Sequence, residues 1–158
     1  MTNPLISDNR IFPVGGSCSC GETKYSLHKA PMFVHCCHCT WCQRETGSAF
    51  ALNALVESSN LILEEGEVEV TEMPSNSGAG QQIVRCKACS SALWSHYGAA
   101  RELVAFLRVG TLDNPNICPP DIHIFTSTKQ AWVNLEGVVP VMEEYYQHGQ
   151  TSDGHDNR

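Results

Sequence analysis

The chain lacks long apolar runs, an excess of positive charge and an evident export signal. No stretch approaches the roughly 20 apolar residues that a membrane-spanning helix needs, so we expect no membrane association. Lys and Arg number 10 against 17 Asp and Glu, which gives a net charge of -7. Nucleic-acid binding calls for a basic face, and we therefore expect no nucleic-acid partner. Residues 1–8 have neither a basic region nor an apolar core, so we also expect no signal peptide.

Cysteine, in contrast, is abundant. The chain contains nine cysteines, an odd number, and most of them stand in C-x-C or C-x-x-C spacings. A secreted disulfide scaffold usually has an even number of cysteines and an export signal. We therefore expect reduced thiols that bind metal in a cytoplasmic protein.

The sequence also lacks sustained helical periodicity, and short β-prone segments follow one another instead. We predict strands over residues 23–27, 32–35, 49–56, 61–63, 68–70, 92–94, 103–111, 122–125 and 131–133. The glutamate-rich turn at 64–67 predicts that its two flanking strands form a hairpin. Residues 43–47 are typical of a turn or a single helical turn that ends at Gly47. We interpret the chain as one all-β domain over residues 11–140, with polar tails at 1–10 and 147–158.

The densest cysteine cluster lies at residues 36–42, where four cysteines and a histidine occupy seven positions. Cys37, Cys39 and Cys42 form a C-x-C-x-x-C run, in which tight turns can direct three thiolates to one point. Three convergent thiolates are typical of a soft-metal site, and zinc is the expected occupant. Catalytic zinc sites often have three protein ligands and one open position.

Two further cysteine pairs lie far apart in the chain. Cys18 and Cys20 form one pair, Cys86 and Cys89 form the other, and together they predict a closed four-cysteine structural zinc site. Such a site would join the N-terminal strands to the middle of the chain. Two alternatives stay open. Cys36, His35 or His38 could supply a fourth ligand to the central cluster and make two structural sites, or the pairs could combine differently.

The cysteine motifs and their surroundings resemble the family of glutathione-dependent formaldehyde-activating enzymes, which is grouped with centromere protein V. The matching stretches are residues 16–21 (GSCSCG), Tyr25, 37–42 (CHCTWC), 47–50 (GSAF), 86–89 (CKAC), 109–113 (VGTLD), 123–125 (HIF) and Trp132. Their order and spacing cover roughly residues 11–140. Two positions depart from the family pattern. Cys36 adds a cysteine before the central motif, and Ser90 stands where the family prefers glycine.

The resemblance implies a mainly β fold of several short, coiled antiparallel sheets around two zinc ions. It implies that Cys18, Cys20, Cys86 and Cys89 hold the structural zinc, and that Cys37, Cys39 and Cys42 hold the catalytic zinc. The family's named activity joins formaldehyde to glutathione, which is a carbon-sulfur lyase reaction run in reverse. The implied partners are therefore a small thiol such as glutathione and a small aldehyde.

Two functions follow from these observations. The first is a zinc-dependent carbon-sulfur lyase-like enzyme that adds a thiol to formaldehyde or a related aldehyde. The alternative is a non-catalytic, zinc-stabilised protein-interaction module. Because glutathione is anionic, we expect Arg44 or Arg85 to offset the negative charge of the cysteine cluster.

Overall fold

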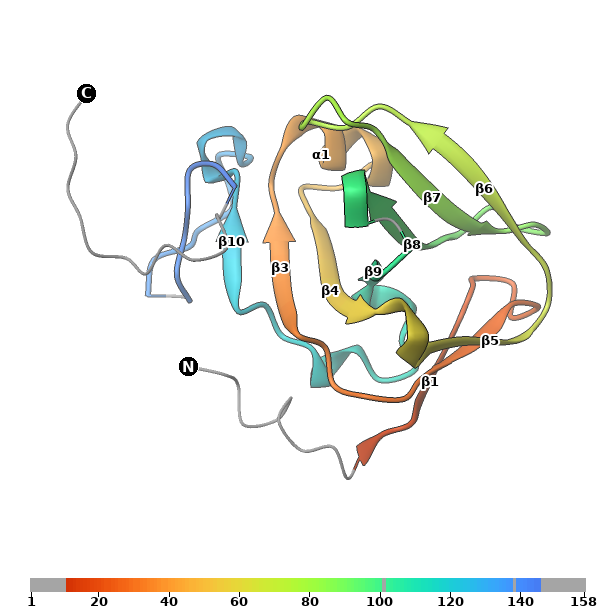
Figure 1. Cartoon of the computed structure of the whole chain (residues 1–158). Coiled ribbons are helices and arrows are strands. Elements are labelled where there is room, and N and C mark those ends of the chain that lie inside the picture. The colour runs from red at the N-terminus through yellow and green to blue at the C-terminus, as the bar shows by residue number, and fades with distance from the viewer. Residues whose placement is uncertain (1–10, 101, 138, 146–158) are drawn as a thin grey trace.

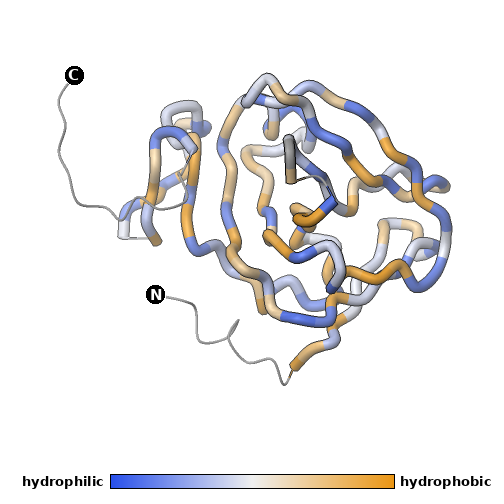
Figure 2. The backbone as a smooth tube through the Cα atoms, viewed as in Figure 1, coloured by the Kyte–Doolittle hydropathy of each residue, from blue (hydrophilic) through white to orange (hydrophobic). Residues whose placement is uncertain are grey.

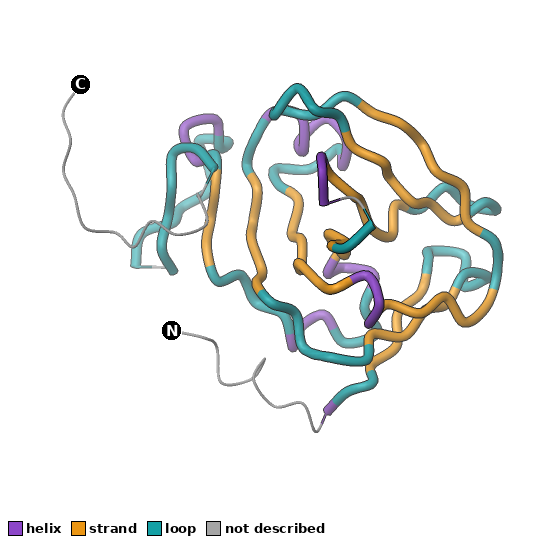
Figure 3. The backbone as a smooth tube through the Cα atoms, viewed as in Figure 1, coloured by secondary structure: helices purple, strands orange, loops and turns teal. Residues whose placement is uncertain are grey.

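The computed structural model describes residues 11–100, 102–137 and 139–145, so both predicted tails lie outside the described residues. Strands dominate these parts of the chain (Figure 3). The mainly β fold class predicted from the sequence is confirmed. Helix is limited to short 3-10 turns and one α-helix, α1 (Thr40–Thr46). None of the described helices has the length and apolar character to cross a membrane.

The strands form two sheets, which Figure 1 shows as a small and a large curved layer. The three-stranded sheet has the order β1-β2-β5, and the seven-stranded sheet has the order β10-β3-β4-β9-β8-β7-β6. The strands are β1 (Val14–Ser17), β2 (Lys24–Leu27), β3 (Phe33–Cys37), β4 (Ala51–Glu57), β5 (Leu61–Glu65), β6 (Val68–Met73), β7 (Gln81–Cys86), β8 (Ala92–Tyr97), β9 (Val104–Arg108) and β10 (Ile122–Ile124). All pairings are antiparallel except that of β10 with β3, which is parallel.

Hydrophobic and hydrophilic residues alternate along several strands in Figure 2, as sheets with one buried face require. The main core contains Leu27, Val34, Ala54, Leu93 and Leu107, each of which is almost fully buried. Tyr25 belongs to the same core, and its ring packs edge-on against Trp94 of the large sheet. The two sheets therefore share one interior.

Two local predictions are wrong, and β1 and β7 are strands that the sequence patterns did not predict. Residues 61–63 and 68–70 do lie in strands, β5 and β6, but these strands do not pair with each other. β5 pairs with β2 and β6 pairs with β7, because the turn at Gly66 carries the chain from one sheet to the other. Residues 131–133 form a turn and an irregular segment rather than a strand. The segment before Cys18, not predicted as a strand, forms β1.

Candidate metal centres

The structure brings the seven predicted cysteines together in two separate groups. One group contains Cys18, Cys20, Cys86 and Cys89, and the other contains Cys37, Cys39 and Cys42. Within each group, the sulfur atoms all lie within 4.8 Å of one another. All nine cysteines are free of disulfide bonds. The groups are those that the spacing predicts, and metal ligation by these residues stays a prediction.

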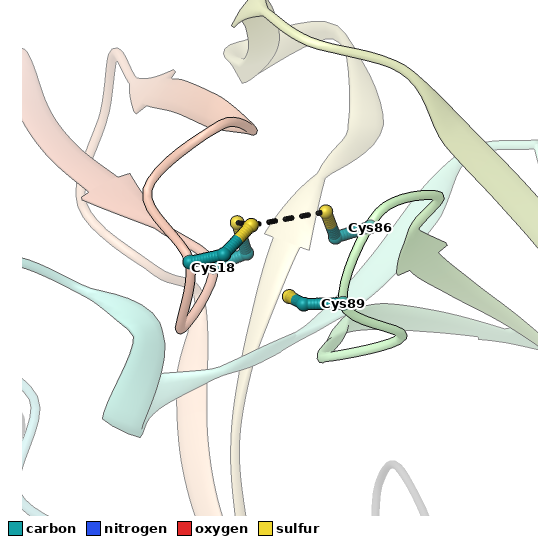
Figure 4. A group of neighbouring side chains, drawn as sticks. Cys18, Cys86 and Cys89 are labelled. Atoms are coloured by element: carbon teal, nitrogen blue, oxygen red, sulfur yellow. Dashed lines mark hydrogen bonds between the residues drawn. The ribbon is translucent and has the colours of Figure 1, made fainter.

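The four-cysteine group lies between the two sheets. Cys18 and Cys20 follow the end of β1, whereas Cys86 ends β7 and Cys89 lies in the turn before β8. Figure 4 shows the side chains of Cys18, Cys86 and Cys89 directed toward one another from the two loops. The group is thus formed by residues 66 positions apart, across two different sheets.

The sulfur separations in this group fit a tetrahedral zinc site. The Sγ atoms of Cys18 and Cys20 are 3.4 Å apart, and those of Cys20 and Cys86 are 3.9 Å apart. Zinc-sulfur bonds of 2.3 Å in tetrahedral geometry place sulfurs about 3.8 Å apart. The hydroxyl of Ser91 lies 3.1 Å from the Cys89 sulfur, and hydrogen bonding from Ser91 lowers the pKa of Cys89 to about 5. A thiolate is the form that binds a metal.

The three-cysteine group is built on the junction between β3 and α1. Cys37 is the last residue of β3, Cys39 is the N-cap of α1, and Cys42 lies in the first turn of the helix. The Cys39 sulfur accepts a hydrogen bond from the Cys42 backbone nitrogen at 3.3 Å. Gly47 ends the helix in the left-handed conformation, as the predicted stop at this glycine requires. The helix itself begins earlier than predicted, at Thr40.

Hydrogen bonds among the three sulfurs favour a thiolate at Cys39, and a thiolate can bind a metal cation. Hydrogen bonds from the Cys37 thiol and then the Cys42 thiol lower the pKa of Cys39 to about 3. The same hydrogen bond raises the pKa of Cys37 well above its usual range. Among the described residues, no fourth Cys, His, Asp or Glu joins this group. His35, Cys36 and His38 therefore do not complete it in this conformation.

Arg108 is a buried cation that the sequence analysis did not select. It is 8% exposed, and its guanidinium donates to Asn53 Oδ1 at 2.6 Å and to Ser95 Oγ at 3.1 Å. Both partners are neutral. The hydrogen bond with Cys37 lowers the pKa of Cys42, but the hydrogen bond with Cys39, burial and the charge of Cys39 together raise it to about 12, and the charge of Arg108 is a smaller effect that opposes this rise. Three thiolates with one zinc ion would carry a charge of 2 - 3 = -1, which Arg108 would offset.

The two arginines proposed from the sequence lie elsewhere. Arg85 forms an ion pair with Glu45 at 2.8 Å, and both side chains are largely buried, so its charge is already offset. Arg44 is exposed on α1. The signal for Arg108 was its place within the apolar segment 103–111, where a charged residue needs a specific partner.

A buried polar network extends from Arg108 toward β3. Asn53 and Arg108 face each other across β4 and β9, and the amide of Asn53 lies 3.3 Å from Nε2 of His35. Burial, and then the charge of Arg108, lower the pKa of His35 to about 4, so its ring is neutral at pH 7. His35 and Cys37 are two residues apart on β3 and point to the same face. The network therefore lines the side of the sheet that carries the three-cysteine group.

One shallow hollow in the described surface lies at the other centre. It is lined by Glu22, Gly66, Glu67 and Lys87 beside the four-cysteine group. Lys87 and Glu67 form an exposed ion pair across it. Both charged side chains are exposed and paired with each other, which is unlike the buried acid-base groups of a catalytic cavity. The hollow therefore has no assigned role.

A family model described as glutathione-dependent formaldehyde-activating enzyme matches residues 13–128. The chain therefore belongs to this family, and the resemblance seen in its cysteine motifs is confirmed. A crystal structure of a Rhodobacter sphaeroides protein is also similar, at 17% sequence identity and a TM-score of 0.48. That alignment covers 80% of this chain and 98% of the other. No curated protein matches the chain.

Proposed function

We propose that this chain is a zinc-dependent, carbon-sulfur lyase-like enzyme that adds a thiol such as glutathione to formaldehyde or a related small aldehyde. Membership of the glutathione-dependent formaldehyde-activating enzyme family supports this reaction class. The observation that carries the proposal for this chain is the three-cysteine group, which no fourth Cys, His, Asp or Glu completes within the described ranges. A non-catalytic module with two structural ions would instead favour a closed set of four protein ligands.

In this proposal Cys37, Cys39 and Cys42 hold the catalytic zinc, and Cys18, Cys20, Cys86 and Cys89 hold the structural zinc. When bound by these three thiolates, a zinc ion would supply Lewis acidity, which favours the thiolate form of a thiol substrate and polarises an aldehyde carbonyl. The residues of the chain supply the setting for this chemistry. Arg108 offsets the negative charge of the three thiolates, and the neutral His35 leaves that offset unchanged near pH 7.

The exposed part of the site lies on α1. Trp41 is 43% exposed and Phe50, just beyond the helix, is 36% exposed, whereas Cys37 and Cys39 are buried. Cys42 is partly exposed and is thus the ligand nearest to solvent. Arg44, two residues further on and exposed, is a candidate to bind a carboxylate of an anionic thiol substrate. We further propose a single domain over residues 11–140 and, from the nine free thiols, a cytoplasmic setting.

The reaction can be followed by NMR exchange spectroscopy of glutathione, formaldehyde and their adduct. The zinc-loaded chain is expected to accelerate adduct exchange above the spontaneous rate. Cys39→Ser should abolish the acceleration, whereas Cys118→Ser should keep it, because Cys118 is a buried cysteine outside both groups. The proposal would be overturned if the zinc-loaded chain left the exchange rate at its spontaneous value for both thiols, glutathione and cysteine, and for both aldehydes, formaldehyde and acetaldehyde.

A further inference from the structure

A third group of metal-ligating side chains lies outside the two predicted centres. It consists of Cys36 on β3, His38 just beyond the end of β3, and His123 on β10. A ligand atom of each residue lies within 4.8 Å of the others. The three residues are 2%, 0% and 8% exposed, respectively. Together they offer one thiolate and two imidazoles in a buried position.

The parallel pairing of β10 with β3 creates this group. His123 is the direct partner of Cys36 in that pairing, so the two side chains stand on the same face of the sheet. His38 follows Cys36 by two residues and is fixed by a backbone hydrogen bond from its nitrogen to the Ile124 oxygen at 3.0 Å. The chain then returns beside β10, where the Met142 nitrogen donates to the His123 oxygen at 2.8 Å.

The third group is separate from the three-cysteine group. Cys36 and Cys37 are adjacent on β3, so their side chains project to opposite faces of the sheet. Cys37 and Cys39 pack with Ile122 and Ile124, which lie on that second face, on either side of His123. The two groups are therefore arranged back to back across β3.

The histidine pair is not fully satisfied by the protein. His38 Nε2 and His123 Nδ1 are 2.8 Å apart and share a hydrogen bond. In a neutral imidazole one ring nitrogen donates and the other accepts. Nδ1 of His38 is buried and has no hydrogen-bond partner among the described residues. This group of three residues thus contains a fully buried imidazole, His38, whose Nδ1 has no hydrogen-bond partner in the described chain.

We propose that Cys36, His38 and His123 bind a further divalent transition-metal ion of the zinc class. Thiolate and imidazole are ligands that zinc prefers. Zinc sites with two cysteines and two histidines, or with three protein ligands in total, are common. Zinc-nitrogen bonds of 2.0–2.1 Å require ligand nitrogens about 3.3 Å apart. An ion bound through Nδ1 of His38 would give this unpartnered nitrogen a ligand role. An ion bound instead through the two nitrogens that share the hydrogen bond would move them about half an ångström apart.

The protons of the three ligands can be accounted for when the ion binds. Binding releases the Cys36 thiol proton to solvent, and each imidazole keeps one N–H. The ion with one thiolate then carries 2 - 1 = +1. Cys36 is the cysteine by which this chain departs from the family pattern, and the third group gives that additional thiol a function.

Zinc content tests the proposal directly. Wild-type protein, Cys36→Ser, His123→Phe and the control Cys118→Ser are purified under reducing conditions, loaded with zinc and freed of excess metal. We expect Cys36→Ser and His123→Phe each to hold one zinc ion per chain fewer than wild type, and Cys118→Ser to match wild type. Equal zinc content in wild type and in folded Cys36→Ser overturns the proposal.

A measurement on unmodified protein covers the case in which the variants fail to fold. X-ray absorption of the zinc-loaded wild type should show imidazole scattering at 2.0–2.1 Å beside the sulfur shell at 2.3 Å. A spectrum without imidazole scattering overturns the proposal. Zinc content and X-ray absorption do not depend on catalysis. Their outcomes are therefore independent of the exchange measurement proposed for the three-cysteine group.

Discussion

Ser90 shows how one residue stores conformational energy beside a metal centre. It follows the Cys86 and Cys89 pair, and its φ of 61° lies in the left-handed region. Its nitrogen donates to the Cys86 oxygen at 2.8 Å, which closes the turn around the sulfurs. The left-handed conformation costs a non-glycine residue about 1–2 kcal/mol. Ser90 therefore has a strained backbone at the position where the family prefers glycine.

Ser90→Gly is expected to raise the free energy of unfolding by about 0.5–1 kcal/mol. Glycine removes the strain but is more flexible in the unfolded chain, which cancels part of the gain. Chemical denaturation of the zinc-loaded protein would measure the change. Ser90→Ala is the matched control, because alanine keeps the strain, and an equal gain in that variant would contradict the explanation.

Arg108 is the residue on which the electrostatics of the three-cysteine group depend. Its Nε is buried without a hydrogen-bond partner in the described part of the chain, and its two other contacts are to neutral side chains. A buried cation is costly unless a nearby anion compensates it. Thiolates of the three-cysteine group would supply that anion, and the charge of Arg108 acts on Cys42, where it opposes the overall rise in the pKa of this thiol.

Arg108→Met should therefore weaken metal binding at the three-cysteine group by about 10–100-fold, the usual effect of losing a residue that supports metal ligands. Competition with a coloured chelator would give the affinity. Arg85→Met is the control, because Arg85 is paired with Glu45. Loss of affinity in both variants, or in neither, would show that Arg108 does not stabilise the bound ion.

At the scale of elements, the contact between β1 and β2 depends on the absence of a side chain at Gly16. Gly16 faces Tyr25 in the antiparallel pairing. A Cβ at Gly16 would lie 2.2 Å from the Tyr25 ring and 2.8 Å from the Thr111 oxygen. The Tyr25 hydroxyl is held by a hydrogen bond to Thr111 at 2.7 Å, so the buried ring cannot move away freely.

Gly16→Ala is expected to lower the free energy of unfolding by about 1–3 kcal/mol, as overpacking of a core does. Gly110→Ala is the matched control, since a Cβ there meets no atom within 4 Å. Thermal denaturation of both variants tests this explanation. If the two substitutions had similar effects, close packing of Tyr25 on β1 would not be their cause.

For the whole molecule, a zinc ion bound by the four-cysteine group would link the two sheets. It would join the end of β1 in the small sheet to the turn between β7 and β8 in the large sheet. The free energy of zinc binding at structural sites is also folding free energy, on the order of 10 kcal/mol in small zinc modules. The three-cysteine group, in contrast, uses residues at most five positions apart.

Cys86→Ser should consequently destabilise the protein by about 4 kcal/mol or more, because it removes a ligand from the ion that joins the sheets. Cys39→Ser should lose activity and keep a cooperative unfolding transition, because its group spans only the β3-α1 junction. Circular dichroism melts with and without a chelator would separate the two cases. A comparable loss of folded protein in both variants would contradict separate structural and catalytic roles.

The sequence determined the features that depend on neighbouring residues. C-x-C and C-x-x-C spacings place sulfurs together whatever the rest of the chain does, so Cys37, Cys39 and Cys42 could be grouped directly. Alternating apolar residues predicted most strands, and Gly47 predicted the end of α1. The two distant pairs, Cys18 with Cys20 and Cys86 with Cys89, predicted one four-cysteine group, and the family motifs agreed with that partition.

Only the tertiary structure decided which distant segments meet. The local turn at 64–67 resembles a hairpin, yet β5 and β6 belong to different sheets. Arg108 acquires its role from Asn53 and Ser95 on neighbouring strands. Cys36, His38 and His123 come together only because β10 lies parallel to β3, 85 residues away. Strand pairing over such distances depends on the packing of the whole core, which no local pattern of residues records.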